Sequence, residues 1–364
     1  KFIWITNYQH EFFLKEAKQL LSCYQIKIFI HKEKVKKGEA GSLFDLIDKL
    51  DEKFIFLNGD IIFDIDIKRL HKFHNLNKSQ ITFVTHLTNH PEDSDCIIES
   101  PNLSINKYKF KNEKNDVKGF YLGNSGLSVL SKKAIKIIDK SFIKTNKELS
   151  LFKDIIINCH NQKLRTFSYN TSEYLKDMGT PKRLLNVKND IKKGKVKSLS
   201  YLKRQKALFL DRDNTIIKCK KGEYILDFDQ INLLTNRVKI ISKIANKFDL
   251  VILITNQPQI AMGKVSWEKV IMINGEIIRL CQDHNLNIAT FYLCPHHNHM
   301  GFKEEIKELK INCFCRKPLP GMFLKASYER NIDLTKSLLI GDSWRDKAAA
   351  ENLKMKFLNV NEFD

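Results

Sequence analysis

Residues 207–215 read ALFLDRDNT, a short apolar run that ends in two aspartates one residue apart. An apolar run without polar alternation indicates a strand that is covered on both faces, as in a parallel sheet. Comparable runs follow at residues 250–254, 288–293, 337–340 and 356–360, and segments with helical periodicity lie between them. Strands that alternate with helices predict a doubly wound, mainly parallel α/β sheet over residues 206–364.

The first half of the chain repeats this alternation with a different sequence. Strands are expected at residues 2–5, 26–30, 53–57 and 81–87, and helices near 10–22 and 66–76. This pattern predicts a second doubly wound, mainly parallel α/β domain over residues 1–190. Residues 191–205 are basic and lack hydrophobic periodicity, so they are expected to form a linker between the two domains.

Composition sets the class of protein. The 364 residues include 43% hydrophobic and 29% charged side chains, which is typical of folded globular domains and excludes a disordered chain. The formal net charge of +20 favours anionic ligands such as phosphates and nucleotides. The sequence has neither an arginine-rich tail nor a basic stripe with interleaved aromatics, the features that would indicate a nucleic-acid platform. Because neither a signal peptide nor an apolar run of about 18 residues is visible, a cytoplasmic protein without a membrane partner is expected.

Acidic residues follow two of the apolar strands in the second domain. Asp211 and Asp213 follow residues 207–210, and Asp342 follows residues 337–340. Because open α/β sheets bind ligands beyond the carboxyl ends of their strands, these side chains are expected to converge. Mg²⁺ relieves the repulsion between close carboxylates and binds them together with a substrate phosphate. The pattern predicts an Mg²⁺ site, with Asp211 as the nucleophile that forms an aspartyl-phosphate and Asp213 as general acid and base.

Three of the eight cysteines lie close together in the sequence beside a histidine cluster. The motifs CPH at 294–296 and CFC at 313–315 supply two pairs of soft and borderline metal ligands. Three cysteines and one histidine form a Cys₃His set that binds Zn²⁺ tetrahedrally. Four protein ligands leave no open position, so the expected zinc is structural. The residues alone leave His296 and His297 as alternatives for the fourth ligand.

On these motifs, residues 207–364 resemble the haloacid dehalogenase superfamily. The matching motifs are D-x-D-x-T at 211–215, Thr255, Lys317 and G-D-S-x-x-D at 341–346. Within the superfamily, CPH at 294–296 and CFCRKP at 313–318 resemble the group of D-glycero-D-manno-heptose-1,7-bisphosphate phosphatases and histidinol-phosphatases. The resemblance implies a Rossmannoid domain without a large cap.

The resemblance also implies roles for particular residues. Catalytic roles go to Asp211, Asp213, Thr255 and Lys317, and substrate binding goes to Thr215, Asn256, Gln257 and Arg316. The implied metal ligands are Asp211, Asp213 and Asp342 for Mg²⁺, and Cys294, His296, Cys313 and Cys315 for Zn²⁺. The chain departs from the group at Asn214, where glycine is usual, and asparagine tolerates unusual backbone angles. It also has Pro258-Gln259 where Ser-Gly is usual.

The first domain carries motifs of another family. GEAGS at 38–42 and NGD at 58–60 resemble the sugar-1-phosphate nucleotidyltransferases, with weaker matches at Phe110-x-x-Glu113-Lys114, 123–126 and 177–181. The resemblance covers residues 1–190 and implies that Asp60 and Asp177 bind Mg²⁺ at a site for a nucleoside triphosphate. The family's Gly-rich phosphate loop is missing before Gly38, which predicts an excerpt or a non-catalytic remnant. The lack of an initiating Met favours an excerpt.

The two domains together predict a function in nucleotide-heptose biosynthesis, for lipopolysaccharide or related glycans. An Mg²⁺-dependent phosphatase would remove the 7-phosphate of D-glycero-D-manno-heptose 1,7-bisphosphate, and the product would be the 1-phosphate that a nucleotidyltransferase uses. One alternative is a histidinol-phosphatase. Another is a basic nucleic-acid-binding protein whose phosphatase fold trims 3′ ends or is inert. The sequence indicates neither the anomer, nor the nucleotide base, nor the oligomeric state.

Overall fold

The computed structural model describes residues 1–22, 24, 26, 28–88, 91–111, 118–138, 148–220, 222–299 and 301–363. The chain forms two compact units. The first contains Lys1–Asn58, His74–Thr82 and Ser128–Thr166, and the second contains Gly59–Phe73, Phe83–Leu127 and Phe167–Asp364. Among the described helices, none has both the length and the apolar character that crossing a bilayer would need.

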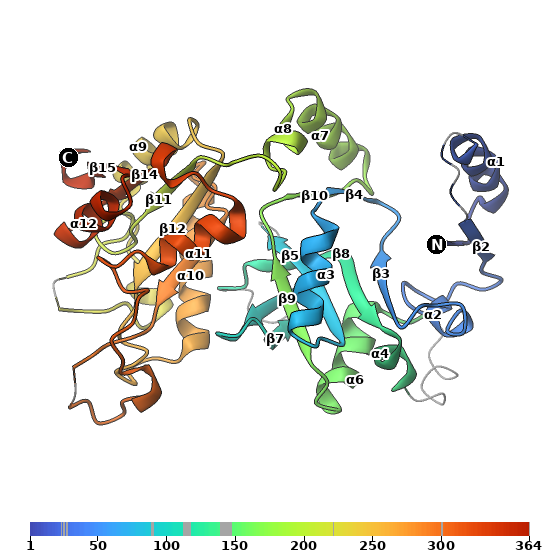
Figure 1. Cartoon of the computed structure of the whole chain (residues 1–364), viewed down its shortest axis with the longest axis horizontal. Helices are drawn as coiled ribbons and strands as arrows, with labels where there is room; N and C mark the ends of the chain where they lie inside the picture. Colours follow the sequence, from blue (N-terminus) through green and yellow to red (C-terminus); the bar gives the residue numbers. More distant parts are fainter. Residues whose placement is uncertain are drawn as a thin grey trace. The chain divides into compact units, whose positions relative to one another are not determined.

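The first half of the chain contains a six-stranded sheet and two separate pairs of strands. Its described elements are β1 (Phe2–Thr6), α1 (His10–Leu21), β2 (Ile28–Lys32), α2 (Ser42–Asp45), β3 (Lys53–Leu57), β4 (Ile61–Asp64), α3 (Ile67–Leu76), β5 (Ile81–Leu87), β6 (Cys96–Glu99), β7 (Ile105–Lys109), β8 (Leu122–Ser131), α4 (Lys132–Lys136), α6 (Ile156–Asn161), β9 (Thr166–Asn170), β10 (Tyr174–Asp177), α7 (Pro181–Lys192) and α8 (Lys195–Ser198) (Figure 1). The strand order is β7-β6-β8-β5-β9, and β3 pairs with β8. Strand β6 is antiparallel to β7 and β8, β1 and β2 form a separate parallel pair, and β4 pairs antiparallel with β10.

A capped helix follows each strand of the β4–β10 ladder. Asp66 caps α3, because its side chain accepts hydrogen bonds from the backbone N–H groups of Lys68 and Arg69. Helix α7 begins with Pro181 in its first turn, and the Thr180 side chain accepts a hydrogen bond from a backbone N–H of that turn. These caps fix where the chain leaves β4 and β10, which carry the acidic residues of the first domain.

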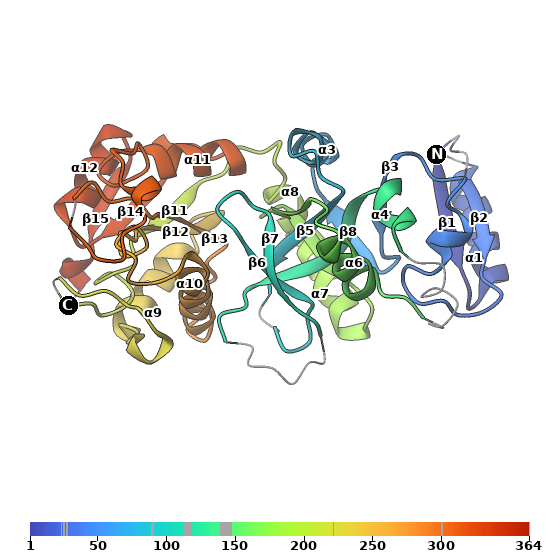
Figure 2. The same cartoon turned by 90° about the horizontal axis from the view of Figure 1, so that it is seen from below.

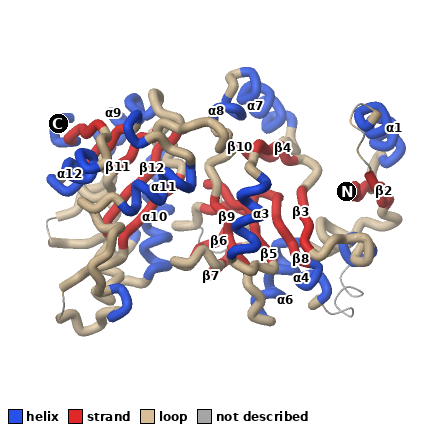
Figure 3. Tube along the Cα trace, viewed as in Figure 1, coloured by secondary structure: helices blue, strands red, loops and turns tan. Residues whose placement is uncertain are grey.

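The second half of the chain contains a five-stranded parallel sheet. Its elements are β11 (Ala207–Leu210), α9 (Thr235–Ala245), β12 (Leu250–Asn256), α10 (Trp267–Gln282), β13 (Thr290–Cys294), α11 (Gly321–Arg330), β14 (Leu338–Gly341), α12 (Trp344–Asn352) and β15 (Lys356–Asn359). The strand order is β13-β12-β11-β14-β15, and every neighbouring pair is parallel. Figure 3 shows these strands in red and the surrounding helices in blue. Strand β11 is central, so the residues that follow it lie in the middle of the edge that the carboxyl ends of the strands form.

Helices cover both faces of this parallel sheet. Figure 2 shows α9 and α10 on one face and α11 and α12 on the other. The side chains of β11 alternate between the two cores: Leu208 and Leu210 pack in one, and Ala207 and Phe209 in the other. All four are completely buried. Because burying a leucine or phenylalanine side chain stabilises the fold by about 1.5–3 kcal/mol, a polar residue within this strand is strongly disfavoured.

The prediction of a mixed α/β fold with mainly parallel sheets is confirmed. The sequence analysis did not identify β4, β6, β7 or β10, which are only four or five residues long. Strand β7 reads INKYK and has exposed Asn106 and Lys107 between buried Ile105 and Lys109, so it lacks the apolar run that marks β11. The segment expected to be a linker, residues 191–205, includes the last two residues of α7 and all of α8. The domain boundaries at residues 190 and 206 stay a prediction.

Candidate active site

Three strands of the parallel sheet bring polar residues to one rim. Asp211 directly follows β11, Thr255 lies near the end of β12, and Asp342 directly follows β14. All three strands are parallel, so their carboxyl ends lie at the same edge of the sheet. The convergence expected of Asp211 and Asp342 is present, because their carboxylate oxygens and one of Asp346 lie within 4.8 Å of one another.

Lys317 connects two of these carboxylates. Its ammonium nitrogen lies 2.5 Å from Asp211 Oδ1 and 2.6 Å from Asp346 Oδ1, and it also donates to the backbone oxygen of Ile254 at 3.0 Å. The side chain of Lys317 is 3% exposed, and those of Asp211 and Asp346 are 10% and 1% exposed. Gly341 leaves room for the Asp346 side chain, because a Cβ at position 341 would lie 2.6 Å from that side chain. The site is therefore a buried ionic centre.

Burial and charge set the protonation of this centre. Burial raises the pKa of Asp211 to about 7, against the opposing charge of Lys317. Burial also raises the pKa of Asp342, and the nearby charge of Asp346 raises it further. Burial works to lower the pKa of Lys317, but the charges of Asp211 and Asp346 outweigh it and hold that pKa above its usual value. One lysine thus faces three carboxylates, an excess of negative charge that a divalent cation would balance.

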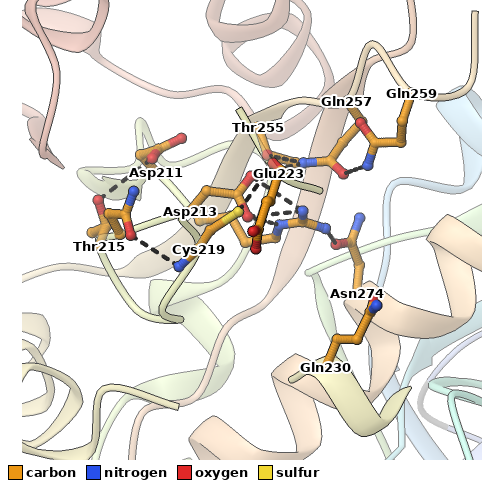
Figure 4. Close-up of polar contacts among 12 residues, drawn as sticks. Asp211, Asp213, Thr215, Cys219, Glu223, Gln230, Thr255, Gln257, Gln259 and Asn274 are labelled. Carbon is orange, nitrogen blue, oxygen red and sulfur yellow. Dashed lines mark hydrogen bonds and ion pairs between the residues drawn. The ribbon is translucent and has the colours of Figure 1, made fainter. Parts of the chain in front are cut away.

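Asp213 lies in a separate polar network beside this centre (Figure 4). The buried Arg212 guanidinium donates to both Asp213 oxygens at 2.9 and 3.1 Å, and to Asn274 Oδ1 at 2.9 Å. Gln257 Nε2 donates to Asp213 Oδ2 at 3.2 Å and to Thr255 Oγ1 at 2.6 Å. The side chain of Asp213 is still 29% exposed. The network therefore holds a carboxylate in a fixed orientation while leaving it open to solvent.

The turn after Asp211 depends on two polar side chains. Asn214 has a φ of 57°, in the left-handed region that asparagine tolerates. Its side-chain oxygen accepts a hydrogen bond from the backbone N–H of Cys219. Thr215 is fully buried, and its hydroxyl lies 3.5 Å from Asp211 Oδ2. These contacts hold the turn that follows Asp211 in place.

The remaining residues expected to bind substrate have different surroundings. Asn256 exchanges hydrogen bonds with the backbone N–H and C=O of Lys317 at 3.0 and 3.1 Å. Gln257 is completely buried and accepts a hydrogen bond from the Gln259 side chain. Arg316 donates to the backbone oxygen of His296 at 3.2 Å. Asn256 and Gln257 therefore position other residues of the site within the chain.

The Cys and His motifs form a compact cluster. One ligand atom each of Cys294, His296, Cys313 and Cys315 lies within 4.8 Å of the others. Cys294 Sγ is 3.5 Å from Cys313 Sγ and 3.1 Å from Cys315 Sγ, and His296 Nδ1 is 3.2 Å from Cys315 Sγ. Hydrogen bonding with Cys294, together with neighbouring His296, lowers the pKa of Cys315 to about 5 despite burial. The donor set and its spacing suit a tetrahedral metal ion.

The geometry distinguishes the two candidate histidines. His296 points its Nδ1 at the cysteines, whereas the Nδ1 of His297 accepts a hydrogen bond from the backbone N–H of His299. The His297 ring packs against His299 and Phe302 instead. His296 is therefore the histidine placed with the cysteines, and this cluster anchors the segment that carries Lys317.

The acidic pair of the first domain lies on the β4–β10 ladder. Asp60 precedes β4 and Asp177 ends β10. A Cβ at Gly179 would meet Asp60 Oδ2 at 2.7 Å and Asp177 Oδ1 at 3.3 Å, so both carboxylates flank this glycine. Asp177 Oδ1 also accepts a hydrogen bond from the Gly179 N–H at 2.7 Å, and Arg183 lies 3.3 Å from Asp177 Oδ2. The structure therefore brings together the two residues expected to bind metal there.

Other motifs of the first domain are structural in their contacts. Gly38 has a φ of 75°, and a Cβ there would collide with the backbone of Leu149. The Ala40 N–H donates to the Leu149 oxygen, which ties the 38–42 turn to that segment. The motif at 123–126 lies within β8. Glu113 and Lys114 lie outside the described residues.

Three residues of the site were not selected from the sequence. Asp346 was quoted in a motif but not as a ligand, although its carboxylate groups with Asp211 and Asp342 while that of Asp213 does not. The Ser343–Asp346 capping box at the start of α12 was the signal that could have placed it. Arg212 and Asn274 orient Asp213, but nothing in the sequence marks a buried arginine or asparagine as part of a site.

Comparison with known proteins gives two family matches. The nucleotidyl transferase family model matches residues 1–194, more than half of the chain, and the polynucleotide kinase 3 phosphatase family model matches residues 206–363. The D-glycero-beta-D-manno-heptose-1,7-bisphosphate 7-phosphatase of Pasteurella multocida (strain Pm70) is 33% identical over 152 residues, which cover 42% of this chain and 79% of that protein. The protein of the same name from Vibrio cholerae serotype O1 is 36% identical over 145 residues, which cover 40% of this chain and 75% of that protein.

One solved structure extends the comparison. It is the D,D-heptose 1,7-bisphosphate phosphatase of B. bronchiseptica, crystallised in complex with magnesium and phosphate. The two chains are 26% identical with a TM-score of 0.35, and the match covers 42% of this chain and 78% of that one.

The matches define an enzyme of the phosphoric monoester hydrolase class, joined to a nucleotidyltransferase-like domain. The chain belongs to the nucleotidyl transferase family over residues 1–194 and to the family of D-glycero-beta-D-manno-heptose-1,7-bisphosphate 7-phosphatases over its second half. Both family resemblances expected from the sequence are confirmed.

Proposed function

We propose that the second domain removes the 7-phosphate of D-glycero-D-manno-heptose 1,7-bisphosphate in nucleotide-heptose biosynthesis. The observation that carries the proposal is the buried centre in which Lys317 contacts both Asp211 and Asp346 beside Asp342. Such a centre suits phosphoryl transfer, because preorganised charges stabilise the charge on the transferring group. The names of the relatives with 33% and 36% identity point to the heptose substrate.

Asp211 and Asp213 have different roles in the proposed reaction. Asp211 attacks phosphorus, so that an acyl-phosphate bond forms while the bond from phosphorus to the sugar oxygen breaks. Asp213 protonates the departing sugar oxygen and then takes a proton from the water that hydrolyses the aspartyl-phosphate. Arg212 and Gln257 support this role, because they orient the Asp213 carboxylate while 29% of it stays exposed.

The acidic group fits a magnesium ion. Asp211 and Asp342 each have a carboxylate oxygen that Lys317 does not engage, and oxygen ligands suit Mg²⁺. Both oxygens of Asp346 already accept hydrogen bonds, from Lys317 and from Ser343, so Asp346 supports the site through Lys317. When bound, Mg²⁺ would supply positive charge that neutralises the phosphoryl oxygens.

The cysteine cluster fits a structural zinc ion. Cys294, His296, Cys313 and Cys315 fill a tetrahedral set and leave no position for substrate. The cluster joins the end of β13 to the segment that precedes Arg316 and Lys317. Zinc would therefore hold Lys317 in place against Asp211 and Asp346 without taking part in the reaction.

The first domain supports a companion reaction. Membership of the nucleotidyl transferase family implies a nucleotide ligand, and Asp60 and Asp177 lie together on either side of Gly179. We infer that this domain, when it is completed by the family's Gly-rich phosphate loop, uses the heptose 1-phosphate that the phosphatase releases, together with a nucleoside triphosphate. A sugar 1-phosphate is the chemical product that remains when the 7-phosphate of the bisphosphate is removed.

Substrate assays test the proposal directly. The purified chain with Mg²⁺ is incubated with heptose 1,7-bisphosphate, histidinol phosphate and a DNA strand that ends in a 3′-phosphate, and inorganic phosphate is measured. The proposal expects kcat/KM for the bisphosphate to exceed the other two values by at least about 100-fold, as differential transition-state binding permits. Faster release from histidinol phosphate or from DNA would replace the proposed function with that alternative.

A further inference from the structure

Three hydrogen bonds connect Gln259, in the turn after β12, to Asp213 and Thr255 (Figure 4). Gln259 Nε2 donates to Gln257 Oε1 at 2.5 Å, and Gln257 Nε2 donates to Asp213 Oδ2 at 3.2 Å and to Thr255 Oγ1 at 2.6 Å. Thr255, Gln257 and Gln259 are completely buried, whereas the Asp213 side chain is 29% exposed. The network therefore runs from a buried amide to a carboxylate that solvent and substrate can reach.

The amide of Gln257 serves this network in one orientation. An ionised carboxylate accepts hydrogen bonds and cannot donate them, so Gln257 has to present its NH₂ group to Asp213. Its oxygen then lies against Gln259, whose NH₂ group donates to it. If the Gln257 amide were turned over, its NH₂ group would face the NH₂ group of Gln259, and its oxygen would face the carboxylate. Gln259 therefore favours the orientation in which Gln257 donates to Asp213.

The side chain of Gln259 distinguishes this chain from the group that its second domain resembles, where glycine is usual at this position. The turn that carries it is fixed, because the Gln257 N–H donates to the Cys294 oxygen at 2.7 Å and the Lys264 N–H donates to the Gln259 oxygen at 3.0 Å. Among the described residues, none forms a hydrogen bond with Gln259 Oε1, although this atom is buried. An unpaired buried amide oxygen destabilises a fold. A side chain that is kept at such a cost beside a catalytic carboxylate is expected to serve the reaction.

We propose that Gln259 is a positioning residue for phosphoryl transfer, which acts through Gln257 on the orientation of Asp213. The inference rests on the proposed function, in which Asp213 protonates the departing sugar oxygen. A general acid acts only when its proton lies within hydrogen-bond reach of the leaving oxygen. A small rotation of the Asp213 carboxylate therefore slows this step, even though Arg212 still contacts both of its oxygens.

The test compares two substrates whose leaving groups differ in their need for a proton. The sugar oxygen of heptose 1,7-bisphosphate takes up a proton as it departs, whereas 4-nitrophenyl phosphate releases a stable phenolate that needs none. The quantity to compare is kcat/KM with Mg²⁺, because it covers the steps up to the departure of the leaving group and excludes the later hydrolysis of the aspartyl-phosphate. The ratio of kcat/KM for the bisphosphate to kcat/KM for the aryl phosphate therefore measures how well Asp213 acts as an acid.

Gln259→Met keeps the approximate size of the side chain and removes its donor. It is expected to lower the ratio by about 10-fold, a part of the roughly 100- to 10,000-fold that general acid catalysis supplies. Gln259→Glu puts an acceptor in place of the donor, which favours the turned-over Gln257 amide, so it is expected to lower the ratio at least as far. Gln282→Met, at the last residue of α10, is the matched control and is expected to keep the wild-type ratio.

Circular dichroism of each variant checks that the fold is retained. A folded Gln259→Met enzyme with the wild-type ratio, including one that loses both substrates equally, overturns the inference while the proposed function stands. If Gln259→Met does not fold, the wild-type ratio in Gln259→Glu has the same meaning. A wild-type enzyme that hydrolyses the aryl phosphate but not the bisphosphate refutes the proposed function, and the positioning role of Gln259 fails with it.

Discussion

The two acidic sites of the chain differ in how their charges are balanced. Around Asp211, the partners are almost completely buried, and Lys317 forms ion pairs with two carboxylates of the chain. Around Asp177, the carboxylate is 41% exposed and its partner Arg183 is 50% exposed. Buried charges need partners supplied by the protein, whereas exposed charges are hydrated and screened by solvent. The buried site is therefore organised before substrate arrives, and the open site depends more on what its ligands bring.

The difference follows from the strands that carry each site. Asp211 directly follows a central strand whose four residues are completely buried between two helical layers. Asp60 and Asp177 flank a two-stranded ladder in which most residues of β4 are only partly buried. A side chain at the tip of a central strand has neighbours on both sides, so more of its surroundings are fixed by the fold.

The largest expected effect is on phosphatase activity, and it distinguishes the site at Asp211 from the site at Asp60 and Asp177. Asp211→Asn should lower phosphate release by at least about 1,000-fold, because the nucleophile is lost. Release of inorganic phosphate from heptose bisphosphate measures this effect. The matched control is Asp60→Asn, which should leave phosphate release at the wild-type rate. A turnover in Asp211→Asn above a tenth of the wild-type value would show that another residue is the nucleophile.

The Asp211→Asn variant should lose activity without losing stability. The pKa of Asp211 is raised in the fold to about 7, so its charged form is disfavoured there relative to the unfolded chain. That cost grows as pH rises from about 4 toward 7. Replacing the charge with a neutral amide is therefore expected to leave the metal-free protein at least as stable at pH 7, which urea unfolding would measure.

The next largest effect is on stability, and it compares the buried ion pairs of Lys317 with the exposed ion pair of Arg183. Lys317→Met leaves Asp211 and Asp346 buried without their partner, and this should lower the free energy of unfolding by about 3–5 kcal/mol. Arg183→Met removes an exposed partner of Asp177 and should cost less than about 1 kcal/mol. Urea unfolding of both variants and the wild type measures the difference. Equal losses in the two variants would contradict the contrast between a buried and an open site.

The smallest expected effect concerns the support of Lys317. Cys313→Ser should reduce bound zinc from about one equivalent to well below it and lower the unfolding free energy by about 2 kcal/mol. Elemental analysis of the purified protein and urea unfolding give the two values. Cys219→Ser, at a partly exposed cysteine outside the cluster, is the matched control and should retain the metal. Wild-type protein without zinc would refute the structural role.

The sequence predicted several strands from their apolar residues. Strands β3, β5 and β11 have the predicted bounds. The ALFL run of β11 is completely buried, as an apolar run without polar alternation indicates. Short strands such as β6 and β7 were not predicted, since their pairing depends on antiparallel neighbours that are distant in sequence. Local periodicity carries no information about such a neighbour.

The sequence by itself determined which residue types end the parallel strands, and so it predicted Asp211, Asp342 and the Cys₃His set. Motif spacing is local, and the rule that ligands gather at the carboxyl ends of parallel strands links it to a site. Only the tertiary structure decided that Asp346 joins Asp211 through Lys317, that Arg212 orients Asp213, and that His296 faces the cysteines. These contacts join segments far apart in the chain or depend on which way a side chain points, and packing in three dimensions sets both.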